Sequence, residues 1–254
     1  MLVRIAPADF RHQKRTERLT RLGREKDGIH MKPIGIIGAM GLEVELLRDR
    51  MEDRVETVAA QRHFYAGKLG GVDAVVVCSG IGKVNAALTA QILIDRFDVS
   101  AVINTGIAGG THPGIRVRDV VISDCAAYHD MDPRILALSP PNLREFPADP
   151  ELVRKAEAAC QGKVHCQVGR IATGDQFISD SGVKADIVFR LDPSCVEMEG
   201  GAVAHACAAN GVPFVIIRCI SDNADDEAEM TYDVFEKLAA DDAAEIVTDM
   251  LKNW

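Results

Sequence analysis

The chain has 254 residues, of which 47% are hydrophobic, and a formal net charge of −9 at pH 7. An acidic chain lacks the basic surface that a general nucleic-acid binder needs, and no apolar run approaches the roughly 18 residues of a membrane-spanning helix. The seven cysteines show no Cys-x-x-Cys spacing and lie mostly in apolar runs, so we expect reduced thiols in a cytoplasmic protein and no metal site.

Residues 1–30 are polar and basic, with eight Lys/Arg against four Asp/Glu. They contain no continuous apolar stretch of the kind that a signal peptide has. We expect a poorly ordered or extraneous N-terminal extension, with a basic binding arm as the alternative. Residues 31–254 are expected to form a single domain, because no linker, charge run or internal repeat divides them.

From residue 33 onward, short Val/Ile-rich runs alternate with longer segments of helical periodicity. The expected strands are Ile34–Gly38, His63–Leu69, Ala74–Cys78, Ala101–Asn104, Asp119–Ser123, Val168–Thr173, Cys195–Met198 and Phe214–Cys219. Helices are expected around 44–51, 83–97, 151–160 and 235–251, and Asn210-Gly211 marks a helix end before the last strand. Continuous apolar strands are typical of sheets that are covered on both faces. We therefore predict an α/β fold, a three-layer sandwich with a central mixed β-sheet flanked by helices.

One long stretch, 129–150, shows no regular pattern and holds four prolines, at positions 133, 140, 141 and 147. Ordered loops of this length are commonly binding loops or lids. We expect the same of this segment.

Two clusters of small residues follow expected strands. The first, at 38–43, reads Gly-Ala-Met-Gly-Leu-Glu, where small residues let the backbone approach a ligand and Glu43 opens the next helix. The alternative is that Glu43 only complements the helix dipole. The second, at 104–110, reads Asn-Thr-Gly-Ile-Ala-Gly-Gly and can contact a planar base or a sugar through its backbone, or form a tight turn.

A third cluster is acidic. Val-Glu-Met-Glu at 196–199 carries two carboxylates at alternate positions, so both are expected on one face of a strand. Arg218 precedes Asp222 by four residues at the end of the last expected strand. Charges inside such apolar strands are costly unless they are paired, so a core ion pair between Arg218 and one glutamate is an alternative. Ligands bind at the carboxyl ends of strands in open α/β sheets, which favours a binding site.

Seven motifs occur in an order that resembles a known family. They read Gly-Ile-Ile-Gly-Ala-Met at 35–40, Ser-Gly-Ile-Gly-Lys-Val at 79–84, Asn-Thr-Gly-Ile-Ala-Gly-Gly at 104–110, Tyr-His-Asp at 128–130, Thr-Gly-Asp-Gln-Phe-Ile at 173–178, Val-Glu-Met-Glu at 196–199 and Arg-Cys-Ile-Ser-Asp at 218–222. The chain resembles the 5′-methylthioadenosine/S-adenosylhomocysteine nucleosidases of the nucleoside phosphorylase superfamily over essentially residues 33–251. The resemblance implies a nucleoside phosphorylase-like catalytic domain, a homodimer and no cofactor.

The resemblance also implies catalytic roles. Asp222 would be the general acid that protonates N7 of adenine, and Ser221 would orient it. Glu43, helped by Arg218, would hold and activate the attacking water. Chemistry agrees with this division, because cleavage of a C–N glycosidic bond creates a cationic ribose and an anionic base that needs a proton.

Binding roles follow from the same resemblance. Met198 and Glu199 would contact the ribose, with Glu199 gripping its hydroxyl groups. Phe177 would stack on adenine, and the backbone of Ile178 would read the edge of the base. The base pocket would be lined by Ala108 and Gly109.

The loop that carries Glu43 favours water over phosphate as the nucleophile. Phosphorylases of the superfamily need arginines and a glycine-rich loop there, whereas a carboxylate repels phosphate and can polarise water. The sequence departs from the family's pattern at 131–149, where aromatic residues commonly help to close the 5′-alkylthio pocket across the dimer. Leu136 is expected to replace an aromatic residue in that pocket.

We therefore expect an enzyme that hydrolyses adenine thionucleosides, with small molecules as its partners and with no nucleic-acid or membrane partner. A futalosine hydrolase and a purine nucleoside phosphorylase are alternatives on the same fold. A non-catalytic nucleoside-binding protein is the alternative from another class.

Overall fold

The computed structural model describes residues 32–254. The expectation for residues 1–30 therefore lies outside the described residues. The elements are, in chain order, β1 (Ile34–Gly38), α2 (Gly41–Asp49), β2 (Glu52–Ala59), β3 (Arg62–Leu69), β4 (Val72–Cys78), α3 (Lys83–Phe97), β5 (Ala101–Gly110), β6 (Val120–Tyr128), α4 (Pro133–Leu136), β7 (Phe146–Pro147), α5 (Pro150–Cys160), β8 (Cys166–Thr173), α6 (Ser181–Leu191), β9 (Cys195–Glu197), α7 (Gly200–Asn210), β10 (Phe214–Asp222) and α8 (Ala228–Lys252).

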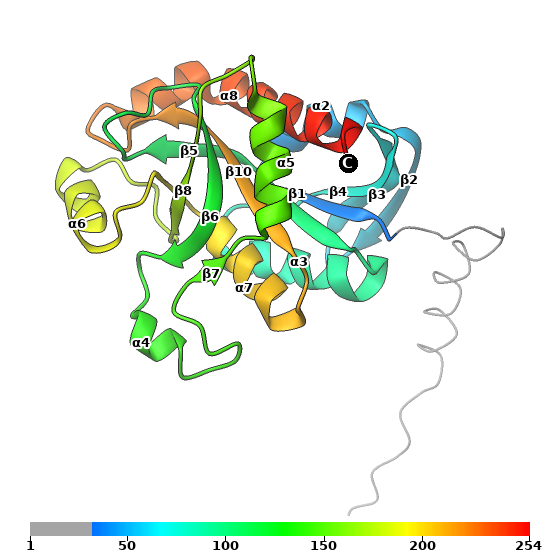
Figure 1. The fold of residues 1–254 in the computed structure, drawn as a ribbon, viewed down its shortest axis with the longest axis horizontal. Coiled ribbons are helices and arrows are strands. Elements are labelled where there is room, and N and C mark those ends of the chain that lie inside the picture. The colour runs from blue at the N-terminus through cyan, green and yellow to red at the C-terminus, as the bar shows by residue number, and fades with distance from the viewer. Residues whose placement is uncertain (1–31) are drawn as a thin grey trace, which may run out of the picture. The chain divides into compact units, whose positions relative to one another are not determined.

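The strands form one mixed sheet, part of which closes on itself (Figure 1). β10 pairs with both β5 and β6, β6 pairs with β8, and β9 pairs with both β8 and β5. These five strands therefore make a closed ring. On the edge of β5 opposite β10, the first residues of β5 pair with β1, which begins an arm in the order β1, β4, β3, β2.

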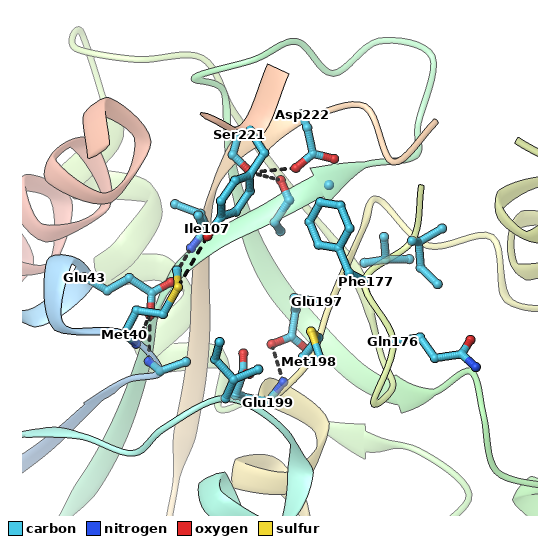
Figure 2. Close-up of a pocket in the computed structure, with 17 residues that line it drawn as sticks. Met40, Glu43, Ile107, Gln176, Phe177, Glu197, Met198, Glu199, Ser221 and Asp222 are labelled. Carbon is cyan, nitrogen blue, oxygen red and sulfur yellow. Dashed lines mark hydrogen bonds between the residues drawn. The ribbon is translucent and has the colours of Figure 1, made fainter. Parts of the chain in front are cut away.

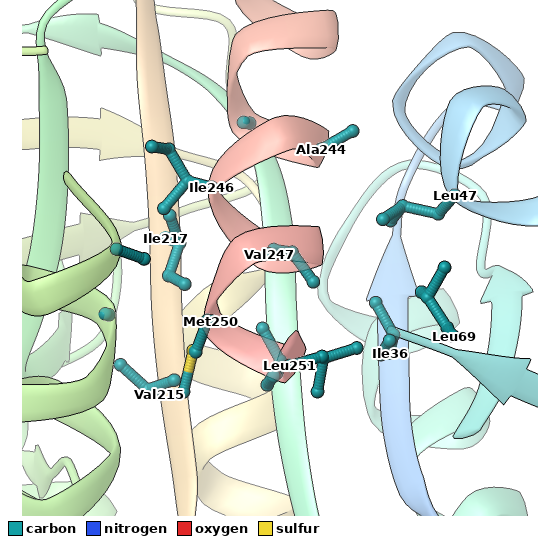
Figure 3. Packing of buried hydrophobic residues seen from close by; sticks show 14 of the residues in the cluster. Ile36, Leu47, Leu69, Val215, Ile217, Ala244, Ile246, Val247, Met250 and Leu251 are labelled. Atoms are coloured by element: carbon teal, nitrogen blue, oxygen red, sulfur yellow. The ribbon is translucent and has the colours of Figure 1, made fainter. Parts of the chain in front are cut away.

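Side chains alternate between two faces of the sheet, as the period of a strand requires. Ile36 and Val215 join the core beneath α2, α5 and α8, while their neighbours Ile37 and Phe214 join the core beneath α3 and α7. Figure 1 shows the two groups of helices on opposite sides of the sheet. In Figure 3, the last turns of α8 bury their apolar side chains against β10 and β1. The predicted fold class, a mixed sheet flanked by helices, is confirmed.

One edge of β5 pairs with the arm at its start and with the ring at its end, and the site lies beside the unpaired stretch between them. β1 pairs with β5 only as far as Asn104, and β9 joins the same edge of β5 only at Gly109. The stretch between these residues has no strand partner on that edge. Its backbone groups are thus free to bind something else.

All eight expected strands are present, but β5, β6 and β10 run several residues further than expected. β2 and β7 were not expected, nor were α6 and the short α4. The helix end at Asn210-Gly211 is confirmed, with Gly211 in the left-handed conformation that caps α7. Segment 129–150 is mostly irregular, as expected, apart from α4, the two residues of β7 and Pro150, which begins α5.

Among residues 32–254, no helix combines the length and the apolar composition that crossing a bilayer requires.

Candidate active site

A pocket opens beside the unpaired stretch of β5, where the carboxyl ends of β1, β5, β9 and β10 meet (Figure 2). Nine of the predicted site residues line it, namely Glu43, Ala108, Gly109, Phe177, Ile178, Met198, Glu199, Ser221 and Asp222. Eight further residues line it, namely Ala39, Met40, Ile81, Ile107, Gln176, Val196, Glu197 and Tyr232. All of them except Tyr232 lie in the clusters or motifs that the sequence singled out, but none had been predicted individually as a site residue.

Asp222 ends β10 and is buried at one end of the pocket (Figure 2). One carboxylate oxygen accepts a hydrogen bond from the Ser221 hydroxyl at 2.7 Å, and the other accepts one from the Ala224 backbone N–H at 2.8 Å. A Cβ atom on Gly109 would lie 2.8 Å from Asp222, so the missing side chain lets β5 approach the carboxyl group. Burial raises the pKa of Asp222, while the Ser221 hydroxyl and the Ala224 N–H oppose the rise. The group is therefore suited to holding a proton.

Glu43 lies in the first turn of α2, and its carboxylate crosses to β5. It accepts backbone hydrogen bonds from Ala39 at 2.6 Å, Met40 at 3.0 Å and Ile107 at 3.0 Å. The Ile107 N–H belongs to the unpaired stretch of β5, so Glu43 takes the place of a strand partner. Burial raises the pKa of Glu43, and Arg218 and the three N–H groups oppose that rise. Glu43 therefore does more than complement a helix dipole.

Arg218 does not line the pocket but lies fully buried behind it. Its guanidinium forms a close ion pair with Glu197 and lies 3.5 Å from Glu199 and 3.9 Å from Glu43. One cation thus serves three buried carboxylates. Burial, together with the charge of Glu197, raises the pKa of Glu199 to about 7, although Arg218 opposes the rise.

The sequence did not distinguish which glutamate of the acidic cluster pairs with Arg218, and the structure identifies Glu197. Its carboxylate accepts hydrogen bonds from the Thr173 hydroxyl and from the backbone N–H groups of Glu199 at 3.0 Å and Gly200 at 2.7 Å. These contacts cap the start of α7, and the pair with Arg218 is the core ion pair that the sequence left open. Its position two residues before Glu199 was the only signal for this role. Glu199 instead accepts the Gly82 N–H at 2.8 Å.

Close packing at the Arg218 cluster requires a glycine in β5. A Cβ atom built on Gly106 would collide with the Glu43 carboxylate and with the Arg218 guanidinium. A side chain there would force apart the two groups that meet at the pocket wall. The glycine-rich motif at 104–110 therefore continues β5 rather than forming only a turn, and its glycine at 106 leaves room for the side chains of Glu43 and Arg218.

Apart from Gln176, most of the remaining pocket wall is apolar. Phe177 is half-exposed and packs edge-on against Tyr232 of α8, with 5.6 Å between ring centroids. The Tyr232 hydroxyl donates to the Met40 sulfur at 3.4 Å. Such walls suit a flat aromatic ligand with an apolar substituent.

Leu136 is not brought to this pocket. It is the buried residue of α4 and belongs to the hydrophobic cluster that also contains Phe146 and residues of α3 and α7. No residue of segment 129–150 lines the pocket. Among residues 32–254, no group of three His, Cys, Asp or Glu side chains has an arrangement that could hold a metal ion.

Comparison with known proteins identifies the family to which the chain belongs. Residues 33–252 match the phosphorylase superfamily. A relative named 5′-methylthioadenosine/S-adenosylhomocysteine nucleosidase, from Exiguobacterium sp., is 42% identical over 226 residues, which cover 86% of this chain and 97% of the relative. The nucleosidase of the same name from Neisseria meningitidis, solved in complex with methylthio-immucillin-A, has a TM-score of 0.84 and 38% identity, covering 88% of this chain and 100% of that chain. The futalosine hydrolase of Helicobacter pylori has a TM-score of 0.83 and 30% identity, covering 88% of this chain and 99% of that chain.

The chain is therefore an enzyme of the phosphorylase superfamily. Within that superfamily it belongs to the family of 5′-methylthioadenosine/S-adenosylhomocysteine nucleosidases, which are N-glycosyl hydrolases. The resemblance predicted from its seven motifs is confirmed.

Proposed function

We propose that this protein hydrolyses the N-glycosidic bond of 5′-methylthioadenosine and S-adenosylhomocysteine, releasing adenine and the 5-thioribose product. The observation that carries the proposal is the distribution of carboxyl groups around one pocket. Asp222 lies at one end, while Glu43 and Glu199 lie nearer the other end (Figure 2). Arg218 lies close to these two glutamates, outside the pocket wall.

Asp222 acts as the general acid in this mechanism. As the C–N bond breaks, its electron pair goes to the base, and the proton of Asp222 goes to N7 of adenine. A group that acts in this way must be protonated near neutral pH, which the burial of Asp222 favours. The contribution of such an acid is roughly 10²–10⁴-fold.

Glu43 positions the water that attacks the ribose carbon on the side opposite the departing base. The bond that forms joins the water oxygen to that carbon, and the water proton passes to the carboxylate. Arg218 and the backbone N–H groups around Glu43 fix the direction of the carboxylate. This resembles the water-activating carboxylate of inverting glycoside hydrolases.

Glu199 and Met198 hold the ribose, and the carboxylate of Glu199 also stabilises the cationic sugar of the transition state. Phe177 stacks on the base, Ile178 contacts its edge through the backbone, and Gly109 lets the base approach β5. The names of the relatives and the analogues bound in their structures support this assignment of substrate.

Futalosine hydrolase is a second candidate, because the fold of the Helicobacter pylori enzyme is equally close. The apolar wall formed by Met40, Phe177 and Tyr232 suits the sulfur-linked alkyl chain next to the ribose that methylthioadenosine and adenosylhomocysteine share and that futalosine lacks. Phosphorolysis is disfavoured by the buried carboxylates, which repel phosphate.

The test is incubation with methylthioadenosine, adenosylhomocysteine, adenosine and futalosine, with free base and free sugar measured with and without phosphate. We expect adenine and methylthioribose from methylthioadenosine at the same rate in both buffers. A phosphate requirement with release of a sugar 1-phosphate would identify a phosphorylase. Binding without release of base would identify a non-catalytic nucleoside-binding protein.

A further inference from the structure

The loop that carries Phe177 and Ile178 into the pocket has almost no backbone support of its own. In the part of the chain that the structure describes, no backbone N–H of residues 175–180 donates to a backbone carbonyl. The position of this loop must therefore be set by side chains. Asp175, two residues before Phe177, makes contacts that can set it.

Asp175 belongs to a network with Lys83 and Asp130, three residues from three separate motifs. The Lys83 ammonium group lies 2.7 and 2.6 Å from the two carboxylate oxygens of Asp130 and 3.6 Å from Asp175. Asp175 accepts the backbone N–H of Lys83 at 2.8 Å and donates its own N–H to Asp130 at 3.0 Å. The ammonium group also lies 5.3 Å from the centre of the Tyr128 ring.

The network is more constrained than an ordinary surface ion pair. The side chains of Lys83 and Asp130 are only 23% and 25% exposed, and both carboxylate oxygens of Asp130 are engaged. Partial burial opposes ionisation of Asp130, yet Lys83 and the Asp175 N–H hold its pKa below the usual range. Four connected contacts fix a geometry that a single exposed pair does not.

The same network reaches the ribose side of the pocket. The N-terminus of α3 donates two successive backbone N–H groups, that of Gly82 to Glu199 and that of Lys83 to Asp175. Gly82 has a positive φ of 95°, and a Cβ atom there would lie 3.1 Å from Asp175. One short segment thus holds both a sugar carboxylate and the anchor of the base loop.

We propose that Lys83, Asp130 and Asp175 are positioning residues that fix the base-binding loop 175–178 against the N-terminus of α3 and so set the affinity for adenine. The inference rests on the proposed function through the contact of Phe177 and Ile178 with the base. No network residue touches the reacting atoms in this assignment. The loop contacts the base equally in the ground state and the transition state, so its loss weakens binding more than turnover.

The experiment compares the wild type with Lys83→Met, Lys83→Arg and Asp175→Ala, measuring the Kd for adenine by calorimetry together with kcat and KM for methylthioadenosine. Lys83→Met and Asp175→Ala should each raise the Kd for adenine and the KM about fivefold to tenfold, with kcat changed by less than about twofold. Lys83→Arg should bind adenine with nearly the wild-type affinity, because arginine keeps the positive charge. In the double variant Lys83→Met/Asp175→Ala, the affinity for adenine should fall by no more than about the larger of the two single losses, because both changes break the same network.

Lys163→Met is the matched control, since it removes a lysine that pairs with Asp249 at 2.5 Å away from this pocket. It should leave Kd and KM unchanged. Folded Lys83→Met and Asp175→Ala variants with normal adenine affinity would overturn the inference, as would equal losses in the control. If Lys83→Met fails to fold, the adenine affinity of Asp175→Ala alone decides the inference, because Asp175 lies at a half-exposed loop position where the substitution is tolerated more easily. A wild type that binds adenine but releases none from methylthioadenosine would refute the proposed function and leave the affinity comparison intact.

Discussion

Replacing Glu199 with glutamine tests the electrostatics of the site through folding stability. Glu199 shares one guanidinium with two other buried carboxylates, and its pKa is raised from 4.5 to about 7. The folded protein therefore keeps a proton that the unfolded chain has already lost between these pH values. Because the folded state then binds more protons, the free energy of unfolding falls as the pH rises through this window.

The size of this effect follows from the shift. At 1.36 kcal/mol per pKa unit, the full loss is about 3 kcal/mol, and about 2 kcal/mol of it falls between about pH 5.5 and about pH 8. Glutamine cannot ionise, so Glu199→Gln should lack this component. Relative to the wild type, the variant should gain about 2 kcal/mol of stability over that range. Titrating groups remote from the Arg218 cluster are common to both proteins and cancel in the difference.

Urea unfolding at a series of pH values measures the difference directly, provided that the m-value stays constant. Glu52→Gln, at the exposed start of β2, is the matched control and should follow the wild type at every pH. Parallel stability curves for the wild type and Glu199→Gln would refute the assignment of a raised pKa to Glu199. Activity should fall in the variant at the same time, which would show that the site keeps Glu199 for function at a cost in stability.

Three further substitutions probe the remaining parts of the site. Asp222→Asn should lower kcat by about 10²–10⁴-fold while substrate binding stays measurable by calorimetry, because the amide can still accept the Ala224 N–H; near-normal turnover would remove Asp222 from the mechanism. Gly106→Ala should lower kcat/KM by roughly 100-fold in a steady-state assay, because the added methyl group displaces Glu43 and Arg218; unchanged kinetics would show that the backbone there can yield. Arg218→Met should lower the free energy of unfolding by about 3–5 kcal/mol at neutral pH, because Glu197 then stays buried without its partner, and a loss below about 1 kcal/mol in urea unfolding would contradict that pairing.

Most of the sheet could be predicted from sequence because its strands are buried on both faces. β2 escaped prediction since it is an edge strand whose side chains are almost all exposed, so it has no apolar alternation. α7 is rich in Gly and Ala and buried nearly all round, which leaves no amphipathic period to detect. The tail of β5 was expected to be a loop because of its glycines. It remains a strand because β10 pairs with it as far as Gly109.

The pocket residues were predictable to the extent that each lies at the end of an apolar strand. Asp222 and Glu199 carry that local signal, and the resemblance to a family gave them roles. Lys83, Asp130 and Asp175 lie in loops and at a helix start, so their meeting depends on how three connections fold over the sheet. Tyr232 lies near the start of α8, three residues before the segment that was expected to be helical, so no periodicity indicated where its side chain points.

The arrangement around Arg218 links the fold to the proposed chemistry. Glu197 forms the close ion pair with the guanidinium and fixes the start of α7, whereas Glu43 and Glu199 lie further from that positive charge. The carboxyl groups around the pocket outnumber this one guanidinium, and burial, together with the charges of Glu197 and Glu43, raises the pKa of Glu199. In the proposed reaction, the ribose becomes cationic only as the bond to adenine breaks. The cationic ribose then becomes a partner for carboxylates that have no full partner in the ground state. Their stabilising interaction is therefore strongest in the transition state, which is the condition for raising the rate.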